Sequence, residues 1–208
     1  LVILLDARAG TPPTAPTLLC RHGEGSNFEN LNSFLGEWEQ WAAEIVESHL
    51  SYPMLSYYRS QHDNESWLTA LAAVMDACAL ALVGIKGIST FQARMTFATA
   101  NLAITELGRV FNVQPENFAK DRLPSTSFSA MRARLEAAGL FFLDDEMAEA
   151  KLLDFRSTYE PLLNGLSQYF LLDLPAWCAS DKQLDNWQHG SGGRMAKELV
   201  EAAPSGAE

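Results

Sequence analysis

The sequence predicts an all-α fold, a single helical-bundle domain of about six to eight helices followed by a flexible C-terminal tail. Apolar residues recur at the three- and four-residue spacing of helices along most of the chain, and no segment shows the alternation of a strand. Gly, Pro and cap-forming residues separate the apolar runs. The 208 residues can bury one core without a disulfide or metal. We assign residues 1–177 to the bundle and the polar residues 178–208 to the tail, which we expect to be disordered.

The first two predicted helices are short. The opening stretch "LVILLDARAG" places five apolar residues before Asp6 and lacks the basic start of a signal peptide. We therefore expect residues 1–8 to be the end of a longer helix that continues from a missing N-terminal region. Thr14 or Thr17 can cap the next helix, which is predicted to stop at Gly23.

The third predicted helix spans about residues 27–50 and is amphipathic. Its glutamates lie mostly off the apolar face, and Pro53 breaks the pattern that follows it. The residues expected on the apolar face are Leu31, Phe34, Leu35, Trp38, Trp41, Ala42, Ile45, Val46 and His49.

The fourth predicted helix, residues 65–83, is apolar on nearly every side, which is typical of a helix in the middle of a bundle. Asp76 interrupts the apolar run, so a buried core helix is favoured over a membrane span. Gly84 and Gly87 are expected to end the helix. The residues that can cap its start are Asp63, Asn64 and Ser66.

Three further helices are predicted downstream. Ser89 and Gln92 have the spacing of a capping box, which opens a helix that runs to about Phe111. The connection after it holds one possible helical turn behind Pro115. The segment 125–129 precedes a helix that ends at Gly139.

The last long helix is predicted from two acidic residues onwards. Asp144 and Asp145 suit a helix N-terminus because their charges favour the positive end of the helix dipole. The pattern continues to about Leu172, and Pro161 is expected to kink or split it.

Charge and motif content exclude several function classes. The net charge is -11 and no large basic patch exists, so no nucleic-acid partner is expected. Three cysteines without metal-ligand spacing indicate a reducing, cytoplasmic compartment. The four histidines form no ligand motif, and no nucleophile motif occurs. We therefore expect no metal site, no cofactor and no enzymatic activity.

The stretch "YYRSQHDNESWL", residues 57–68, gathers amphipathic aromatic rings with charged and titratable groups. Three interpretations are open: the residues pin two helices around a corner, face a neighbouring subunit, or line a small anion pocket. The candidate binding or interface residues are Tyr57, Tyr58, Arg59, His62, Trp67 and Asp76.

Asp76 is included because it lies midway along the most apolar helix, where an unpaired carboxylate would be costly. It requires a buried partner. The candidates are Arg59, Arg94, Arg134 and a tyrosine hydroxyl.

Three segments together resemble a known family. "LLDARAGTPPTAPTLL" (4–19), "WEQWAAEIVESHLSYPMLSYYRSQHDNESWLTALAAVMDACAL" (38–80) and "YEPLLNGLSQYFLLDLP" (159–175) are similar to the helical region that follows the pore in bacterial potassium-channel-like proteins. Those proteins have two transmembrane helices around a pore loop. Their TxGYGD-like filter is absent from these 208 residues, so no conducting residue can be placed here.

The resemblance implies a regulatory or assembly domain on the cytoplasmic side of the bacterial inner membrane. It implies a homo-tetramer around the pore axis and attachment to the membrane through the missing N-terminal region. Residues 1–6 would then transmit movement to the inner pore helix. A negative domain beneath a cation pore would also raise the local cation concentration.

An alternative from a different class is a free-standing helical domain that binds a small ligand, like the regulatory half of a transcription regulator. Its pocket would be lined by Trp38, Trp41, Tyr57 and Met75. The chain contains no helix-turn-helix pattern and no basic surface, which counts against this alternative.

Overall fold

A computed structural model describes residues 2–23, 28–57, 66–117 and 121–178. Over these residues it contains seven α-helices, one 3-10 helix and no strand, which confirms the all-α helical prediction. The elements are α1 (Val2–Ala9), α2 (Ala15–Gly23), α3 (Glu29–Ser51), η2 (Pro53–Tyr57), α4 (Trp67–Gly84), α5 (Thr90–Val110), α6 (Ser125–Ala137) and α7 (Ala148–Phe170). The predicted tail from residue 179 onwards lies outside the described residues.

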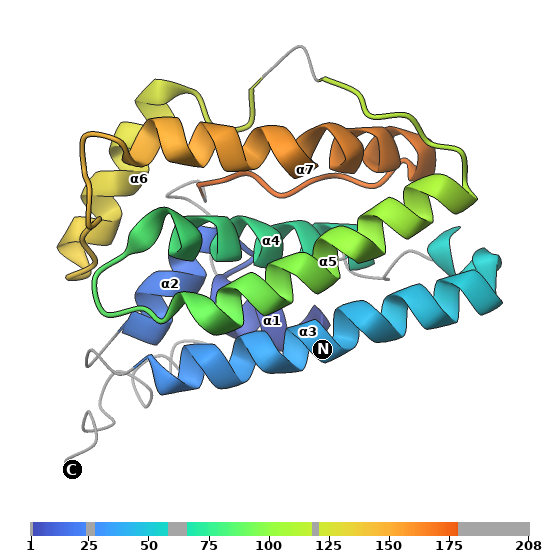
Figure 1. Ribbon diagram of the computed structural model, residues 1–208, viewed down its shortest axis with the longest axis horizontal. Coiled ribbons are helices and arrows are strands. Elements are labelled where there is room, and N and C mark those ends of the chain that lie inside the picture. Colours follow the sequence, from blue (N-terminus) through green and yellow to red (C-terminus); the bar gives the residue numbers. More distant parts are fainter. Residues whose placement is uncertain (1, 24–27, 58–65, 118–120, 179–208) are drawn as a thin grey trace, which may run out of the picture.

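Helix α4 is the centre of the bundle. The helices α3, α5, α4 and α7 run side by side, α1 and α2 lie behind them, and α6 crosses one end (Figure 1). Every residue of α4 except Leu82 is buried, because neighbours cover it on all sides. By length and composition α4 could cross a membrane, but 94% of its 18-residue apolar window is buried inside the bundle. Its uniform apolarity is thus explained by its central position.

The predicted start and stop signals of α4 are confirmed. The Ser66 side chain accepts a hydrogen bond from the backbone N–H of Thr69 at 3.0 Å. Gly84 ends the helix with φ of +109°, and Gly87 turns the chain again with φ of +86°. A side chain at Gly87 would also meet the Phe28 ring at 3.1 Å, so glycine is required there for two reasons.

The predicted capping box at α5 is only half formed. The Ser89 hydroxyl accepts from the N–H of Phe91 at 3.4 Å. The Gln92 side chain does not reach back to Ser89. Its amide instead donates to the Glu39 carboxylate at 2.7 Å, because α3 packs along α5 and supplies a charged acceptor.

Helix α7 is continuous through Pro161, so the predicted split does not occur. Neighbouring segments hold this part of the helix: the Pro161 carbonyl accepts from the N–H of Glu116 at 2.7 Å, and the Asn164 amide donates to the Glu116 carbonyl at 3.1 Å. Residues 113–117 are not helical, and residues 118–120, on which the possible turn after Pro115 would fall, lie outside the described residues.

A strap, residues 171–178, follows α7 and runs back along it (Figure 1). Leu171 reverses the chain in the left-handed conformation, with φ of 53°. The Ser167 hydroxyl then donates to the Leu172 carbonyl at 2.6 Å, and the Thr69 hydroxyl donates to the Asp173 carbonyl at 2.7 Å. The strap is therefore fastened to both α7 and α4.

Candidate functional site

The structure places two residues of the predicted cluster and leaves three outside its description. Tyr58, Arg59 and His62 belong to the undescribed residues 58–65. The buried Trp67 ring packs edge-on against Phe170, and its indole N–H donates to the Ser56 carbonyl at 3.1 Å. Trp67 therefore pins η2 to the start of α4, as the helix-corner interpretation requires.

Tyr57 belongs to an aromatic group at the same end of the bundle. Its ring lies edge-on to Phe111 and Phe170, and its hydroxyl lies 3.2 Å from that of Tyr169. The Tyr57 side chain remains half exposed. Tyr57 is therefore accessible at the surface, whereas Trp67 is buried.

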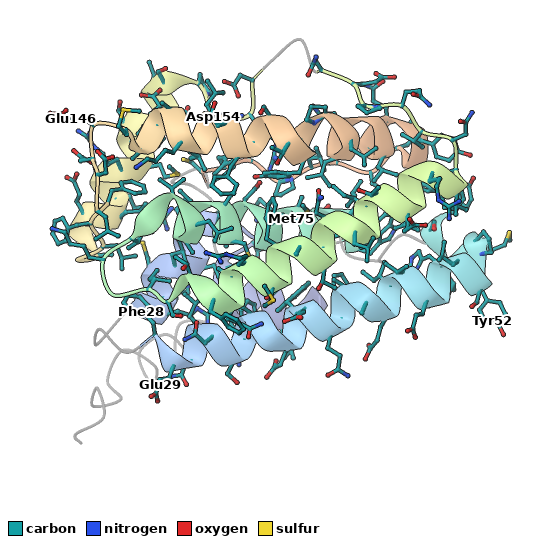
Figure 2. The ribbon with its side chains drawn as sticks, in the orientation of Figure 1. Phe28, Glu29, Tyr52, Met75, Glu146 and Asp154 are labelled. Atoms are coloured by element: carbon teal, nitrogen blue, oxygen red, sulfur yellow. The ribbon has the colours of Figure 1, made fainter. Side chains whose placement is uncertain are left out.

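Exposed apolar side chains gather around Tyr57 where α3, η2, α5 and α7 have their ends. Figure 2 shows Tyr52 at this end of α3, opposite Phe28 and Glu29. We call this surface the end patch. Its members are Leu50, Tyr52, Met54, Leu55, Tyr57, Val110, Tyr169 and Leu171.

Asp76 is buried and has two strong partners. Arg122 binds its carboxylate with both terminal nitrogens, and the Tyr159 hydroxyl donates to Oδ1 at 2.7 Å. The predicted tyrosine partner is confirmed. The predicted arginine partners are wrong for Arg94, which is exposed, and for Arg134, which donates to Thr17. The sequence offered no local signal for Arg122 because its loop folds over the seam between α4 and α7 from 46 positions away.

The Asp76 pair belongs to a larger charge cluster, which comprises Asp76, Asp121, Arg122, Arg156 and Glu160, and of these Asp121 is exposed. Arg122 also donates to Glu160 at 2.8 Å, and Arg156 bridges Glu160 at 3.0 Å and Asp121. Three carboxylates thus surround two guanidinium groups.

Trp177 closes the charge cluster from the strap. Its indole N–H donates to Glu160 at 3.1 Å, and the guanidinium carbons of Arg122 and Arg156 lie 5.8 and 5.5 Å from its ring centroid. Arg122 additionally donates to the Pro175 carbonyl at 2.9 Å. The cluster therefore joins α4, α7, the loop before α6 and the strap.

Burial and ion pairing act in opposite directions on the pKa values in this cluster. Burial raises the pKa of Asp76, and the positive charge of Arg122 offsets part of that rise. Burial likewise raises the pKa of Tyr159 well above its usual range. Since the charged groups are paired with one another and with backbone carbonyls, the arrangement is suited to holding segments together rather than to reacting with a ligand.

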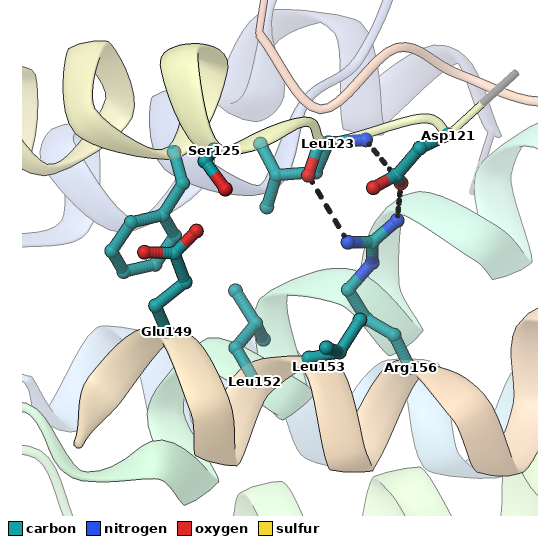
Figure 3. Close-up of a pocket in the computed structure, with 8 residues that line it drawn as sticks. Asp121, Leu123, Ser125, Glu149, Leu152, Leu153 and Arg156 are labelled. Atoms are coloured by element: carbon teal, nitrogen blue, oxygen red, sulfur yellow. Dashed lines mark hydrogen bonds and ion pairs between the residues drawn. The ribbon is translucent and has the colours of Figure 1, made fainter.

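A small pocket of about 80 Å³ lies beside the cluster, between α7 and the start of α6 (Figure 3). Arg156 points into it but is engaged by Asp121 and by the Leu123 carbonyl at 3.3 Å. The volume is below that of typical ligand pockets, which start at about 300 Å³. We assign no ligand to it.

A larger, open pocket of about 480 Å³ lies between α1, α2 and α3. Its lining is mainly polar and includes two arginines in a chain with a strong excess of acids. The lining residues are Ala7, Arg8, Arg21, His22, Asn30, Ser33 and Glu37. Sequence reasoning missed this pocket because its residues come from three helices. The pocket could have been predicted from the basic residues Arg8, Arg21 and His22, which are close together in the sequence.

The pocket expected for the ligand-binding alternative is not formed by the residues named for it. Trp38 and Met75 are fully buried in the core. Trp41 packs edge-on against Trp38 with ring centroids 4.6 Å apart, whereas Tyr57 lies in the aromatic group at the end of the bundle. These four side chains therefore do not face one shared space.

Comparison with known protein families, with characterised proteins and with solved structures finds no match for this chain. Among the described residues, no group of three or more His, Cys, Asp or Glu side chains has the arrangement of a metal site.

Proposed function

We propose that this chain is the regulatory and assembly domain of a bacterial potassium-channel-like membrane protein, on the cytoplasmic side of the inner membrane. The pore-forming part would precede Leu1. The resemblance of segments 4–19, 38–80 and 159–175 to that family supports the proposal, and the all-helical fold is the one that the resemblance implies.

The observation that carries the proposal is the attachment of α1 to the bundle. Leu5 and Ala9 are buried, and α1 packs against α2 and α4. Arg21 from α2 donates to the Ala7 carbonyl at 2.6 Å, which fastens the last turn of α1. A displacement of α1 would therefore move α2 and α4 with it. This is the property that a link between an inner pore helix and a regulatory domain needs.

The end patch supports the assembly part of the proposal. Met54, Leu171 and Tyr52 are 72%, 74% and 69% exposed, which is unusual for large apolar side chains that share one end of a molecule. In a tetramer around a pore axis, such a surface would be covered by the neighbouring subunit. Tyr57 would then be an interface residue.

The experiment that tests the proposal uses the protein with its natural upstream region, reconstituted into liposomes. We expect potassium flux, and we expect Arg21→Gln to change it because the last turn of α1 loses its anchor. The control is Arg94→Gln, which removes the same charge from the exposed face of α5. A protein without potassium flux, or equal flux for both variants, would contradict the proposal.

A further inference from the structure

We propose that the pocket between α1, α2 and α3 is a binding site for a phosphate-bearing anion, with Arg8 and His22 as its recognition residues and Arg21 as a neighbouring positive charge. The site stands independently of the proposed channel function. Only the choice of a membrane lipid as the source of the phosphate rests on that function.

The pocket concentrates positive charge in an acidic protein. Arg8 at the end of α1 and Arg21 at the end of α2 both line it. The Arg8 guanidinium presents planar donors that match the oxygens of a phosphate, whereas Arg21, which donates to the carbonyls of Ala7 and Asp6, adds its positive charge to the pocket. The chain as a whole is strongly acidic, so two arginines in one lining make this pocket a local exception to its charge.

Arg8 is held in place without an acidic partner in the described part of the chain. Its guanidinium carbon lies 5.1 Å above the centroid of the Phe34 ring, a contact that orients the group and leaves its N–H donors at the pocket. An arginine that is positioned by an aromatic ring in this way is prepared for a ligand rather than consumed by an ion pair.

His22 adds a further donor to the pocket, because a bound anion would favour protonation of its imidazole ring. Its Nδ1 donates to the Leu18 carbonyl at 2.9 Å, and its ring packs against Phe34 with centroids 5.2 Å apart. Nε2 is therefore the nitrogen left for a ligand. Burial and the nearby charge of Arg8 lower the His22 pKa despite the bond to Leu18, whereas a bound anion would favour the charged ring.

The start of α3 completes the site. Asn30 and Ser33 contribute polar side chains, and the N-cap residue Phe28 makes no side-chain cap to α3. The positive end of the α3 dipole adds to the field of the two arginines, whereas α1 and α2 have their negative ends at this pocket. Glu37, one turn further along α3, is the one carboxylate that the described residues contribute to the lining, and it opposes anion binding.

The chemistry favours phosphate over a larger or uncharged ligand. The volume of about 480 Å³ accommodates a phosphate ester and its adjoining group. Two sources share this chemistry: the headgroup of an anionic phospholipid and a soluble phosphate ester. If α1 follows a pore helix, the pocket lies near the membrane surface and the lipid headgroup is the source.

The test is a titration of the intact chain with inorganic phosphate at constant pH and ionic strength, followed by the His22 ring signals in NMR. A His22→Gln variant assigns those signals. We expect a saturable shift, an apparent Kd about fivefold weaker in Arg8→Gln and about twofold tighter in Glu37→Gln. Opposite effects of two substitutions in one pocket cannot come from loss of fold.

Two matched controls separate the site from general charge effects. Arg94→Gln removes an exposed positive charge on α5, and Glu47→Gln removes an exposed negative charge on α3 outside the lining. Both should bind phosphate like the unchanged chain. Absence of a saturable shift overturns the proposal, and so do equal affinities for Arg8→Gln and Arg94→Gln.

The source is then identified by co-sedimentation with vesicles of phosphatidylglycerol and phosphatidylcholine. Binding that requires phosphatidylglycerol and is weakened by Arg8→Gln assigns the site to a lipid headgroup. Phosphate binding without vesicle binding assigns it to a soluble phosphate ester. Either result supports the site, and neither depends on whether a pore precedes the chain.

Discussion

Asp76 shows how a buried charge is accommodated in the most apolar helix of the protein. The carboxylate is almost inaccessible, and Arg122 and Tyr159 together satisfy it from two other segments. The need for a partner could be predicted from the sequence because a lone carboxylate is too costly in a core. The identity of Arg122 could not, because it depends on how a loop folds against α4 and α7.

Removing Arg122 should therefore destabilise the fold in a pH-dependent way. Arg122→Ala leaves the Asp76 carboxylate buried without its cation, and we expect the free energy of unfolding at pH 7 to fall by about 3–5 kcal/mol. The folded-state pKa of Asp76, already raised by burial, rises further in the variant because the offset from Arg122 is lost.

The sign of the pH effect follows from that rise. At pH 7 Asp76 is ionised in the unfolded state, whereas the folded variant must either protonate it or bury its charge. This cost to the free energy of unfolding shrinks as the pH falls towards the unfolded-state pKa of Asp76. Urea unfolding at pH 7 and pH 5 should thus show a smaller loss at pH 5. The exposed Arg109→Ala serves as the control. An equal loss at both pH values would contradict the account of Asp76.

At the scale of elements, the helices were predictable where local signals set their ends. Ser66, Gly84 and Gly139 each act at the position that the sequence indicated, and Gly139 has φ of +77°. The half-formed capping box at Gln92 and the absence of a split at Pro161 have a common cause. In both places a neighbouring element supplies a hydrogen-bond partner that the local sequence cannot reveal.

Close approach between α7 and the segment 113–117, which follows α5, gives a second prediction. A Cβ atom at Gly165 would lie 2.2 Å from the backbone oxygen of Gln114, so Gly165→Ala should lower the free energy of unfolding by about 1–3 kcal/mol.

Gly36 in α3 is the matched control. A Cβ atom there meets only the flexible Gln92 side chain at 3.7 Å, so Gly36→Ala should be neutral or stabilising by up to about 1 kcal/mol. Thermal unfolding of the two variants measures both effects. If Gly165→Ala is as stable as Gly36→Ala, the prediction is wrong, because α7 and the segment 113–117 can then move apart without lowering the free energy of unfolding.

At the scale of the whole molecule, the bundle has a buried central helix, α4, and a strap that packs over the charge cluster through Trp177. Exposed apolar side chains form the end patch at one end. The sequence predicted the all-helical class because its periodicity is strong over long segments. The end patch was only partly foreseen, through Tyr57, since its other members come from helix ends that are distant in the chain. The basic pocket was not foreseen for the same reason.

The end patch yields a third prediction, about self-association. We expect the chain to form tetramers as its concentration rises, and we expect Met54→Glu or Leu171→Glu to shift it towards monomers because a charge must then be buried. Light scattering after size exclusion measures this. Leu102→Glu is the control, because Leu102 is also exposed but lies within α5, away from the patch. A concentration-independent monomer would remove the patch as an assembly surface.

The coding sequence upstream of Leu1 is the most direct test of the proposed channel function. We predict two apolar spans of about 20 residues each that flank a Gly-Tyr-Gly filter, with the second span leading into α1. An immediate start codon, or an upstream helix-turn-helix, would contradict it. The question would then turn to ligand-dependent regulation.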